Sequence, residues 1–349
     1  MSRCQAIYFM FTRFTTVLAL IIAMVGCGRN DISHTINQYQ ERIANVLDTP
    51  FNAPMPTTTS VSLVYPSKRL LVNVITPPQL DVKQFFALKK CDLNLLIAQR
   101  NTPLGRTQPP SVRYLYEREV VESLSRCKVL MPEYSALLDD WLEHKLAALP
   151  LAWANLIQTS DETINAFSNN SDFFDSASST ELHTTKSALS YLLDANSQLR
   201  TASNSQELES YLSQLSKSHL PAKTWRTQSV IREELNRTTL WLRKQDLHEQ
   251  CEDGQPSQKV KYLKNVFTLF FIEKIQPIGS ELNRVHYALS PFYQKLSAEP
   301  NLALSFRQFI DAQGDKGFNA YQQAIKSHVQ FWQTLFKQCN MSPTSLNSR

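Results

Sequence analysis

The sequence predicts an all-α fold, a multi-helix bundle with at most one small N-terminal β-hairpin. Glycine is scarce, at 7 of 349 residues, whereas all-β proteins use glycine often at turns and bulges. From Asp81 onward, apolar residues recur at helical spacing almost without interruption. Runs typical of strands are confined to residues 60–65 and 70–75. Together these observations allow one hairpin and otherwise indicate helices.

Composition places the chain among folded globular proteins and excludes nucleic-acid binding. Hydrophobic residues make up 42% of the chain and charged residues 19%, which is not the balance of a disordered protein. The net charge is +5, but Arg3 and Arg13 lie in a segment that we expect to be removed, which leaves 34 basic and 31 acidic residues. A net charge of +3 without any basic run is too close to neutral for a nucleic-acid-binding protein.

The N-terminus has the layout of a bacterial lipoprotein signal. Residues 14–25, FTTVLALIIAMV, form a short apolar run behind a basic stretch, which is the order found in secretory signal peptides. The run ends at Met24-Val25-Gly26-Cys27, which resembles the lipobox of bacterial lipoproteins. We therefore expect residues 1–26 to be cleaved as a signal peptide and Cys27 to carry a lipid anchor.

The alternative is an uncleaved N-terminal membrane helix, but the apolar run is short for about 30 Å of hydrocarbon. Gly28 rather than an Asp follows Cys27. Resemblance to sorted lipoproteins then implies the outer membrane and its periplasmic face, with the inner membrane as the alternative. Translation from Met10 would also yield a complete signal, because Arg13 and the apolar run lie downstream of it.

The sequence holds six cysteines, which are Cys4, Cys27, Cys91, Cys127, Cys251 and Cys339. With the first in the signal and the second lipidated, four remain, an even number that suits disulfides in an oxidising compartment. Four cysteines allow three pairings. We favour Cys91 with Cys127 and Cys251 with Cys339, because each pair lies near helices that are neighbours in sequence or that close the fold. The alternative is zinc ligation, for which a CxxC motif would be expected, and none occurs.

Residues 27–35 are predicted to be a polar tether, and residues 36–48 an amphipathic helix. Residues 49–60 contain three prolines and must be extended or turning. The strand-like runs 60–65 and 70–75 follow, and they are the two that could pair as the small hairpin.

Residues 81–101 carry apolar side chains on more than one face, which predicts a buried central helix. The prolines and the glycine that follow stop this helix, and residues 112–128 form a second one. We expect the two helices to make an antiparallel hairpin at the centre of the bundle, with Cys91 and Cys127 close enough to be joined.

The rest of the chain is predicted to be helical up to residue 339. Further helices are expected at 133–148, 151–167, 181–200, 206–217, 222–249, 258–275, 278–297, 302–312 and 318–339. The polar stretch 168–180 is either a surface loop or the division between two sub-bundles, and unchanged composition on both sides favours the loop. The predicted organisation is therefore a single helical domain over 36–340, followed by a flexible tail over 341–349.

Motifs of common hydrolases, zinc proteases and nucleotide-binding proteins are absent from the sequence. The seven histidines include no pair at ligand spacing on one helix, and His286 and His328 fall on apolar stripes expected of core residues. The stretch 311–317, DAQGDKG, lacks the ligand pattern of a calcium loop and is expected to be an interhelical turn. We predict no catalytic residue, no metal site and no cofactor.

Two further features have both a functional and a structural interpretation. Glu117 and Glu119 could act as acids or bases, but glutamates one turn from arginine are expected to be solvated or paired, here with Arg113 or Arg118.

Arg100 and Asn101, beside Pro103 and Gly105 at a helix end, could bind an anionic or carbonyl group, because a guanidinium is a planar fork of donors. We favour the structural alternative, in which Arg100 offsets the negative helix C-terminus and Asn101 caps it.

The most distinctive span is 88–127, LKKCDLNLLIAQRNTPLGRTQPPSVRYLYEREVVESLSRC. It contains a helix that ends at Arg100-Asn101, then Leu104-Gly105, then a helix through Tyr116-Glu117 that closes on Cys127. Together with QYQERIANVLD at 38–48 and the lipoprotein signal, this span resembles the proteobacterial lipoproteins of the domain-of-unknown-function 3080 family. The resemblance implies an envelope lipoprotein with no assigned activity.

Three functions follow as alternatives. The first is a non-enzymatic scaffold or binding protein, whose partner is a periplasmic protein or another envelope component. The second is a cell-envelope hydrolase or transferase with a dispersed site, and the third is a small-ligand carrier with a cavity between helices. If the protein is an enzyme, we expect a cleft that gathers titratable groups. A scaffold should have an exposed apolar patch, and a carrier should have an enclosed apolar cavity.

Overall fold

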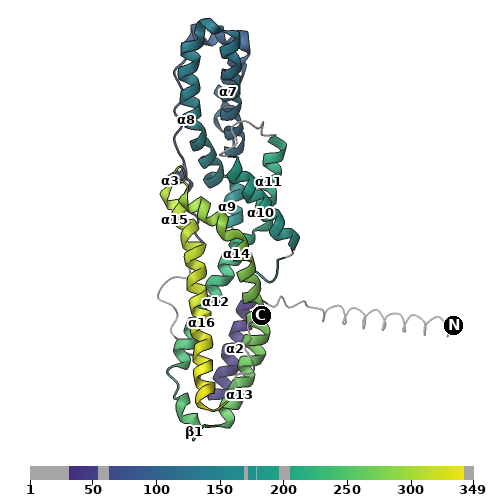
Figure 1. Ribbon diagram of the computed structural model, residues 1–349, viewed down its shortest axis with the longest axis vertical. Coiled ribbons are helices and arrows are strands. Elements are labelled where there is room, and N and C mark those ends of the chain that lie inside the picture. Colours follow the sequence, from purple (N-terminus) through teal and green to yellow (C-terminus); the bar gives the residue numbers. More distant parts are fainter. Residues whose placement is uncertain (1–30, 54–62, 169–171, 178, 196–204, 342–349) are drawn as a thin grey trace, which may run out of the picture.

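The protein is an elongated, almost entirely helical molecule (Figure 1). The computed structural model describes residues 31–53, 63–168, 172–177, 179–195 and 205–341. The predicted all-α class is confirmed. No described helix is both long enough and apolar enough to span a membrane. The predicted signal peptide, Cys27 and all but the first residue of the predicted tail lie outside the described residues.

The elements of the N-terminal half are α2 (Ile32–Leu47), α3 (Lys68–Leu71), α4 (Val82–Ala87), η1 (Leu88–Cys91), α5 (Leu93–Asn101), α6 (Pro103–Arg106), α7 (Pro110–Leu130), η2 (Pro132–Tyr134), α8 (Ser135–Thr159) and α9 (Asp161–Phe167). Those of the C-terminal half are α10 (Ser179–Asp194), α11 (Ser205–Ser218), α12 (Leu220–Leu242), η3 (Leu247–Gln250), β1 (Cys251–Glu252), β2 (Gln255–Pro256), α13 (Gln258–Val266), η4 (Phe267–Ile275), α14 (Gln276–Ala298), α15 (Leu304–Gln313) and α16 (Asp315–Gln338).

The larger hydrophobic core fills the body of the molecule. Helices α12 and α16 lie side by side along the body, α2 and α14 pack on them, and α13 packs on α2 (Figure 1). The largest side chains that are completely buried there are aromatic, and they include Tyr39, Trp153, Trp225 and Trp332. Burial of such rings is the main favourable contribution to folding of this part.

Both histidines that we predicted to be core residues are buried, which confirms that prediction. His328 is hydrogen bonded to the hydroxyl of Thr239 through Nδ1 (2.8 Å) and to the hydroxyl of Tyr39 through Nε2 (2.9 Å). His286 stacks on Phe318, with ring centroids 3.6 Å apart. Burial lowers the pKa of His328 to about 3 and that of His286 to about 4, so both rings are neutral at physiological pH.

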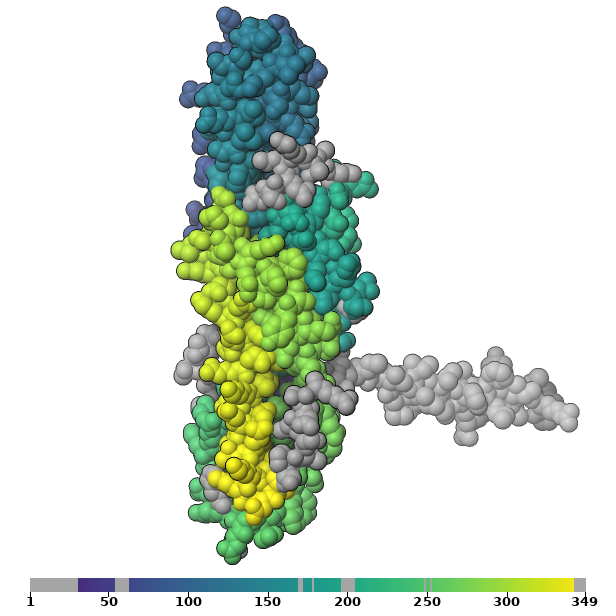
Figure 2. Space-filling model, in the orientation of Figure 1, coloured from purple at the N-terminus to yellow at the C-terminus, as the bar shows by residue number. Residues whose placement is uncertain are grey.

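The upper end of the molecule is an arm (Figure 2), and a second, smaller core lies inside it. We define the arm as the antiparallel pair α7 and α8 together with an outer segment, residues 75–106 (Figure 1). The extended start of this segment runs along α8, where Thr76 is hydrogen bonded to His144, and its helices pack on α7. The core of the arm consists of Leu88, Leu93, Val120, Leu124, Cys127, Met131, Leu138 and Trp141.

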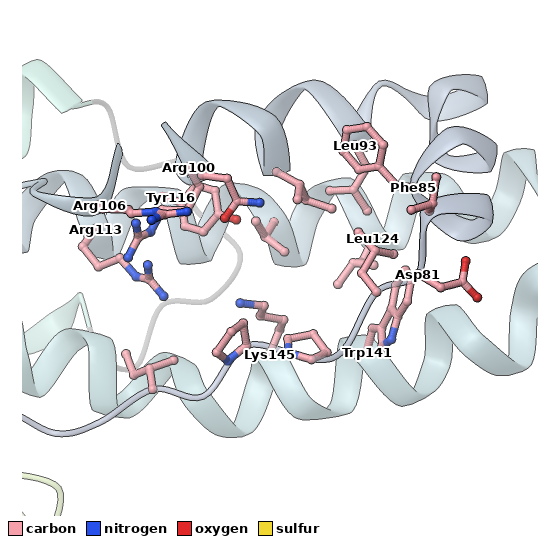
Figure 3. A pocket seen from close by; sticks show the side chains of 18 of the residues that line it. Asp81, Phe85, Leu93, Arg100, Arg106, Arg113, Tyr116, Leu124, Trp141 and Lys145 are labelled. Atoms are coloured by element: carbon pink, nitrogen blue, oxygen red, sulfur yellow. The ribbon is translucent and has the colours of Figure 1, made fainter. Parts of the chain in front are cut away.

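The single central helix predicted over 81–101 is wrong in two respects. It is divided into α4, the 3-10 helix η1 and α5. Asp92, between η1 and α5, adopts the left-handed conformation (φ 60°), which interrupts a right-handed helix. The segment also lies on the arm rather than at the centre of the bundle, and Val82, Phe86 and Leu95 are exposed. The antiparallel arrangement itself is as predicted, because the chain runs from Leu93 to Arg100 in the direction opposite to that from Arg113 to Leu124 (Figure 3). Helix α7 also pairs with α8, and the apolar faces of the outer segment are divided between the arm core and the surface.

The predicted N-terminal β-hairpin is wrong for those of its residues that the structure describes. The short helix α3 includes the first two residues of the expected second strand, and residues 72–75 belong to neither a helix nor a strand. Side-chain amides of α8 take the place of a partner strand. Asn155 exchanges two hydrogen bonds with the backbone of Asn73 (2.7 and 2.8 Å), and Gln158 donates to the carbonyl oxygen of Leu71. A helix thus satisfies backbone groups that would otherwise need a sheet.

Two helical runs continue past prolines where we predicted breaks. Helix α8 passes through Pro150 and ends only before Ser160, whose hydroxyl accepts a hydrogen bond from the amide of Thr163 and so begins α9. Helices α13 and α14 are joined by η4, a π-helical stretch directly before Pro277. Since proline lacks an amide proton and crowds the carbonyl one turn earlier, a wider π-helical turn can accommodate it.

The other helices agree with the predictions to within a few residues, except that α12 ends at Leu242, before the predicted residue 249. The tether predicted over 27–35 is wrong for residues 32–35, because Asp31 caps α2 and the helix begins at Ile32. The polar stretch 168–180 contributes Phe174 to the core, and the amide of Phe174 donates to the hydroxyl of Thr227 (2.8 Å). Whether this stretch divides two sub-bundles stays a prediction. Gly314 joins α15 to α16, which confirms the interhelical turn predicted in place of a calcium loop.

The lower end of the molecule is closed by a short β-hairpin that we did not predict (Figure 1). Its turn residues, Asp253 and Gly254, have φ values of 48° and 74°, the left-handed geometry for which Asp-Gly is favoured in two-residue hairpins. The hairpin holds Cys251 beside Cys339 at the end of α16, with a Cα–Cα distance of 5.1 Å. This is one of the two cysteine pairings that we favoured.

Candidate functional site

A pocket of about 670 Å³ lies in the arm, between the outer segment and helices α7 and α8 (Figure 3). It is lined by Ile75, Pro77, Pro78, Leu80, Asp81, Val82, Phe85, Phe86, Leu93, Ile97, Arg100, Asn101, Arg106, Arg113, Tyr116, Val120, Leu124, Trp141 and Lys145. Its volume is in the range of sites that bind small molecules, about 300–1,000 Å³.

Most of the pocket wall is apolar. Phe85 and Leu93 extend from the outer segment, Leu124 from α7 and Trp141 from α8, and the four lie at the same end of the pocket (Figure 3). The outer segment also contributes Phe86, whose side chain is 54% exposed although it lines the pocket. The apolar surface therefore continues from the interior of the pocket to its rim.

The opposite end of the pocket is cationic. Arg100, Arg106, Arg113 and Lys145 gather there, and they come from α5, α6, α7 and α8 respectively (Figure 3). The pKa of Arg100 is lowered, first by burial and next by the positive charge of Arg113. The cations are thus close enough to repel one another.

One buried acid holds two of these cations in place. Glu117 is completely buried and forms ion pairs with Arg113, one turn before it on α7, and with Lys145 on α8 (2.8 Å). The pair predicted with Arg113 is confirmed, whereas the partner on α8 was missed. Glu119 is exposed. Counting Glu117 against the four cations leaves three positive charges at this end of the pocket.

Tyr116 lies beside the cations and lines the pocket. The ammonium of Lys145 lies 5.9 Å from its ring centroid and the guanidinium of Arg113 lies 5.4 Å from it. Burial raises the pKa of Tyr116 to about 12. At neutral pH the hydroxyl is therefore protonated and can donate a hydrogen bond.

The turn that holds Arg100 is built by Thr102 and Gly105. The hydroxyl of Thr102 accepts from the amide of Gly105 (3.0 Å) and donates to the carbonyl of Gln99 (2.8 Å). Only glycine fits at position 105, because a Cβ there would overlap the carbonyl oxygens of Gln99 and Arg100. The cap predicted for Asn101 is therefore supplied by Thr102 instead.

Arg100 takes part in the turn and also lines the pocket. Its Nη1 donates to the carbonyl of Gly105 (2.6 Å), which stabilises the turn. Its Nε is buried without a hydrogen-bond partner among the described residues, and its side chain, like that of the exposed Asn101, lines the pocket. The pair thus lies where a ligand would contact it.

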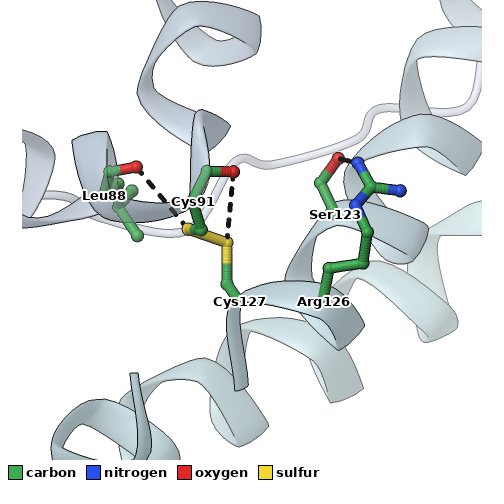
Figure 4. Close-up of a disulfide and its surroundings, with 5 residues drawn as sticks. All are labelled: Leu88, Cys91, Ser123, Arg126 and Cys127. Atoms are coloured by element: carbon green, nitrogen blue, oxygen red, sulfur yellow. Dashed lines mark hydrogen bonds between the residues drawn. A yellow bond between two sulfur atoms is a disulfide. The ribbon is translucent and has the colours of Figure 1, made fainter. Parts of the chain in front are cut away.

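The second favoured cysteine pairing fastens the outer segment beside the pocket. Cys91 at the end of η1 lies beside Cys127 on α7, with a Cα–Cα distance of 5.3 Å (Figure 4). Cys127 is one turn from Leu124 in the pocket wall and one residue from Arg126, which donates to the hydroxyl of Ser123 (2.8 Å). This crosslink restrains the apolar end of the pocket.

The sequence matches the model of a known protein family over most of its length. The sequence model of the family described as "Protein of unknown function (DUF3080)" matches residues 36–343. The chain belongs to this family. Neither the comparison with curated proteins nor the comparison with solved structures returned a match.

The region matched by the DUF3080 family includes both the body and the arm, so the pocket lies within it. From the sequence we singled out Arg100 and Asn101 but missed Arg106, Arg113 and Lys145 as residues of one site. Part of the signal was available, because Arg113 stands one helical turn before Tyr116 and Glu117. No local pattern connects Lys145 with these residues.

Proposed function

We propose that this DUF3080 protein is a non-enzymatic envelope lipoprotein that binds a small, largely apolar ligand in the arm pocket. The observation that carries this proposal is the pocket itself, which has an apolar wall contributed by the outer segment, α7 and α8. Of the three functions that the sequence left open, this favours the small-ligand carrier. A preformed cavity of this size and lining is typical of small-molecule sites.

The lining favours binding over catalysis. It contains no Ser, Thr, Cys or His, so the pairing of a Ser, Thr or Cys nucleophile with a His base is absent from it. The ammonium of Lys145 is held by Glu117. The one carboxylate in the lining is Asp81, which accepts a hydrogen bond from the amide of Gln84 (2.7 Å) as the cap of α4. The hydrolase or transferase alternative gains no support from this arrangement.

The envelope location rests on the sequence. The lipobox-like residues that end at Cys27 favour lipid attachment, and the four remaining cysteines lie as two pairs at disulfide distance, as suits an oxidising compartment. In this proposal the lipid on Cys27 holds the protein at the outer membrane, facing the periplasm, and the arm pocket receives its ligand there.

Photo-crosslinking tests the proposal on the full chain in cell membranes. A neutral twelve-carbon alcohol that carries a diazirine should label peptides of α5, α7 or α8, and excess unlabelled alcohol should compete. Ile97→Trp should abolish this labelling, because Ile97 lines the pocket and the larger ring fills it. Leu95→Trp, on the same helix but 63% exposed and outside the pocket lining, is the matched control and should label normally. Equal labelling of both variants would refute the proposal.

A scaffold remains a second candidate, favoured by one observation at the tip of the arm. Val129 and Leu130, at the end of α7, are 81% and 60% exposed, which is unusual for adjacent large apolar residues without a partner. If a partner protein contacts the tip, the double substitution Val129→Ser and Leu130→Ser should reduce crosslinking to that partner and leave labelling by the alcohol unchanged. Unchanged crosslinking to every partner would contradict this candidate.

A further inference from the structure

We propose that the ligand of the arm pocket is an anionic, single-chain amphiphile. Its carboxylate or phosphate head contacts Arg100 and Arg106, and its chain lies along the apolar wall. This inference rests on the proposed function, because it names the class of ligand that the same pocket binds.

The first support is charge. Four cations converge on one end of the pocket from four separate elements, and the only acid that contacts them among the described residues is Glu117. Like charges gathered in a half-buried site repel one another, and the lowered pKa of Arg100 reflects this together with burial. An anion bound between the guanidiniums would relieve the repulsion.

The second support is the availability of donors. Glu117 engages Arg113 and Lys145, and it leaves Arg100 and Arg106 without an acidic partner among the described residues. Arg100 uses one of its N–H groups on the carbonyl of Gly105, while its buried Nε has no partner in the described chain. Guanidinium groups form two parallel hydrogen bonds with carboxylate or phosphate oxygens. The arginines are therefore suited to an anionic head.

The third support is the gradient of polarity along the pocket. The cations and Tyr116 lie at one end, and Phe85, Leu124 and Trp141 lie at the other (Figure 3). A molecule with a charged head and an apolar tail fits this gradient in one orientation only. The volume of about 670 Å³ is that of a site for one drug-sized molecule, which favours one alkyl chain over two.

The experiment extends the photo-crosslinking assay to a charge series on the full chain in membranes. Twelve-carbon diazirine probes with a carboxylate, a phosphate, an alcohol and a trimethylammonium head are compared. Each probe is compared between the unsubstituted protein and a variant, so that its partition into the lipid cancels. Arg106→Gln is the principal variant, because the side chain of Arg106 is exposed and the substitution should not disturb the fold.

Arg106→Gln should lower labelling by at least one anionic probe roughly 10-fold, as expected for a lost charge-assisted hydrogen bond. Labelling by the alcohol should not change. Arg100→Gln should act in the same direction, and Arg126→Gln, which removes an arginine outside the pocket lining, should have no effect. A stronger effect on the carboxylate probe would assign a fatty-acid head, and a stronger effect on the phosphate probe would assign a phosphate head. Either result supports the inference.

Two results would overturn it. If the alcohol labels the pocket but both arginine variants leave anionic labelling unchanged, the inference fails and the apolar site stands. The same holds if Arg106→Gln lowers labelling by the trimethylammonium probe as much as it lowers labelling by the anionic probes. If no probe labels the pocket of the unsubstituted protein, the proposed function fails together with this inference.

Discussion

Glu117 is the residue on which the charged end of the pocket depends. Its carboxylate is completely buried between Arg113 and Lys145. Burying this carboxylate without a cation would destabilise the folded protein, and burying the two cations without their acid would do the same. The sequence places Arg113 one helical turn from Glu117, but the second partner belongs to another helix, 28 residues away.

Glu117→Gln should therefore destabilise the protein by about 3 kcal/mol, because it leaves Lys145 buried without its acid. Chemical denaturation would measure the change. Glu119→Gln, at an exposed position on the same helix, is the control and should change stability by less than about 0.5 kcal/mol. Similar midpoints for the two variants would show that the ion pairs contribute little.

His328 makes stability depend on pH. Burial lowers its pKa from 6.5 to about 3, so below pH 6.5 the unfolded chain takes up a proton that the folded chain does not. The contribution of the neutral ring is fully present above pH 6.5 and is lost as the pH falls from 6.5 toward 3, by up to about 1.4 kcal/mol for each pH unit. His286, with a pKa of about 4, adds a loss of the same sign.

His328→Gln should weaken this dependence. The variant should be less stable than the unsubstituted protein at pH 7.5, because it loses the packing of the ring, but its stability should fall less between pH 7.5 and pH 4.5. Denaturant midpoints at the two pH values provide the measurement. His34→Gln, at an exposed position, should leave the slope unchanged. An unaltered slope in His328→Gln would assign the acid sensitivity to other groups.

At the scale of elements, the outer segment shows why helical periodicity misled us. Its apolar residues lie in three different environments. Leu93 is in the arm core, Ile97 lines the pocket and Leu95 is exposed. A pattern of apolar residues on several faces is the same for a buried helix and for a segment that lines a cavity. The left-handed Asp92 divides the segment further.

The outer segment should depend on the crosslink between Cys91 and Cys127. Their sequence separation is 36 residues, for which loss of a disulfide is expected to cost roughly 4 kcal/mol. The double variant Cys91→Ser and Cys127→Ser should therefore show faster hydrogen exchange in α4, α5 and the end of α7, with little change in α12 and α16.

The matched control for that experiment is the pair Cys251 and Cys339, with a sequence separation of 88 residues. Replacing both with Ser should loosen the β-hairpin and the end of α16 and leave the arm unchanged. Exchange that increases equally over the whole molecule in either variant would contradict a local role for each crosslink.

At the scale of the whole molecule, two cores of unequal size lie along one axis (Figure 1). The arm core is small, and a small core stabilises its surroundings only weakly without a crosslink. The pocket lies in this less strongly stabilised part, where opening is easiest. Such a place suits a site that must admit and release an apolar ligand.

The proposed membrane attachment also belongs to this scale. Cys27→Ser should leave the chain without fatty acid and either uncleaved or released from the membrane, because the thiol is the proposed site of acylation. Radiolabelled fatty acid and membrane fractionation would measure both effects, with the unsubstituted protein expected in the outer membrane. Cys4→Ser, which lies in the predicted signal, should be acylated normally. Equal labelling of Cys27→Ser would contradict the lipobox interpretation.

The sequence by itself determined the helical class and the membership of the DUF3080 family, because composition, periodicity and motif order are local properties. It also indicated which cysteines lie together and that His286 and His328 are core residues. Only the tertiary structure showed that Lys145 joins Arg113 at Glu117, that side chains of α8 replace a strand partner, and that the outer segment covers a pocket. Periodicity reports that one face of a helix is buried, but not which surface lies against it. The pocket exists only where three successive segments, residues 75–106, α7 and α8, pack against one another.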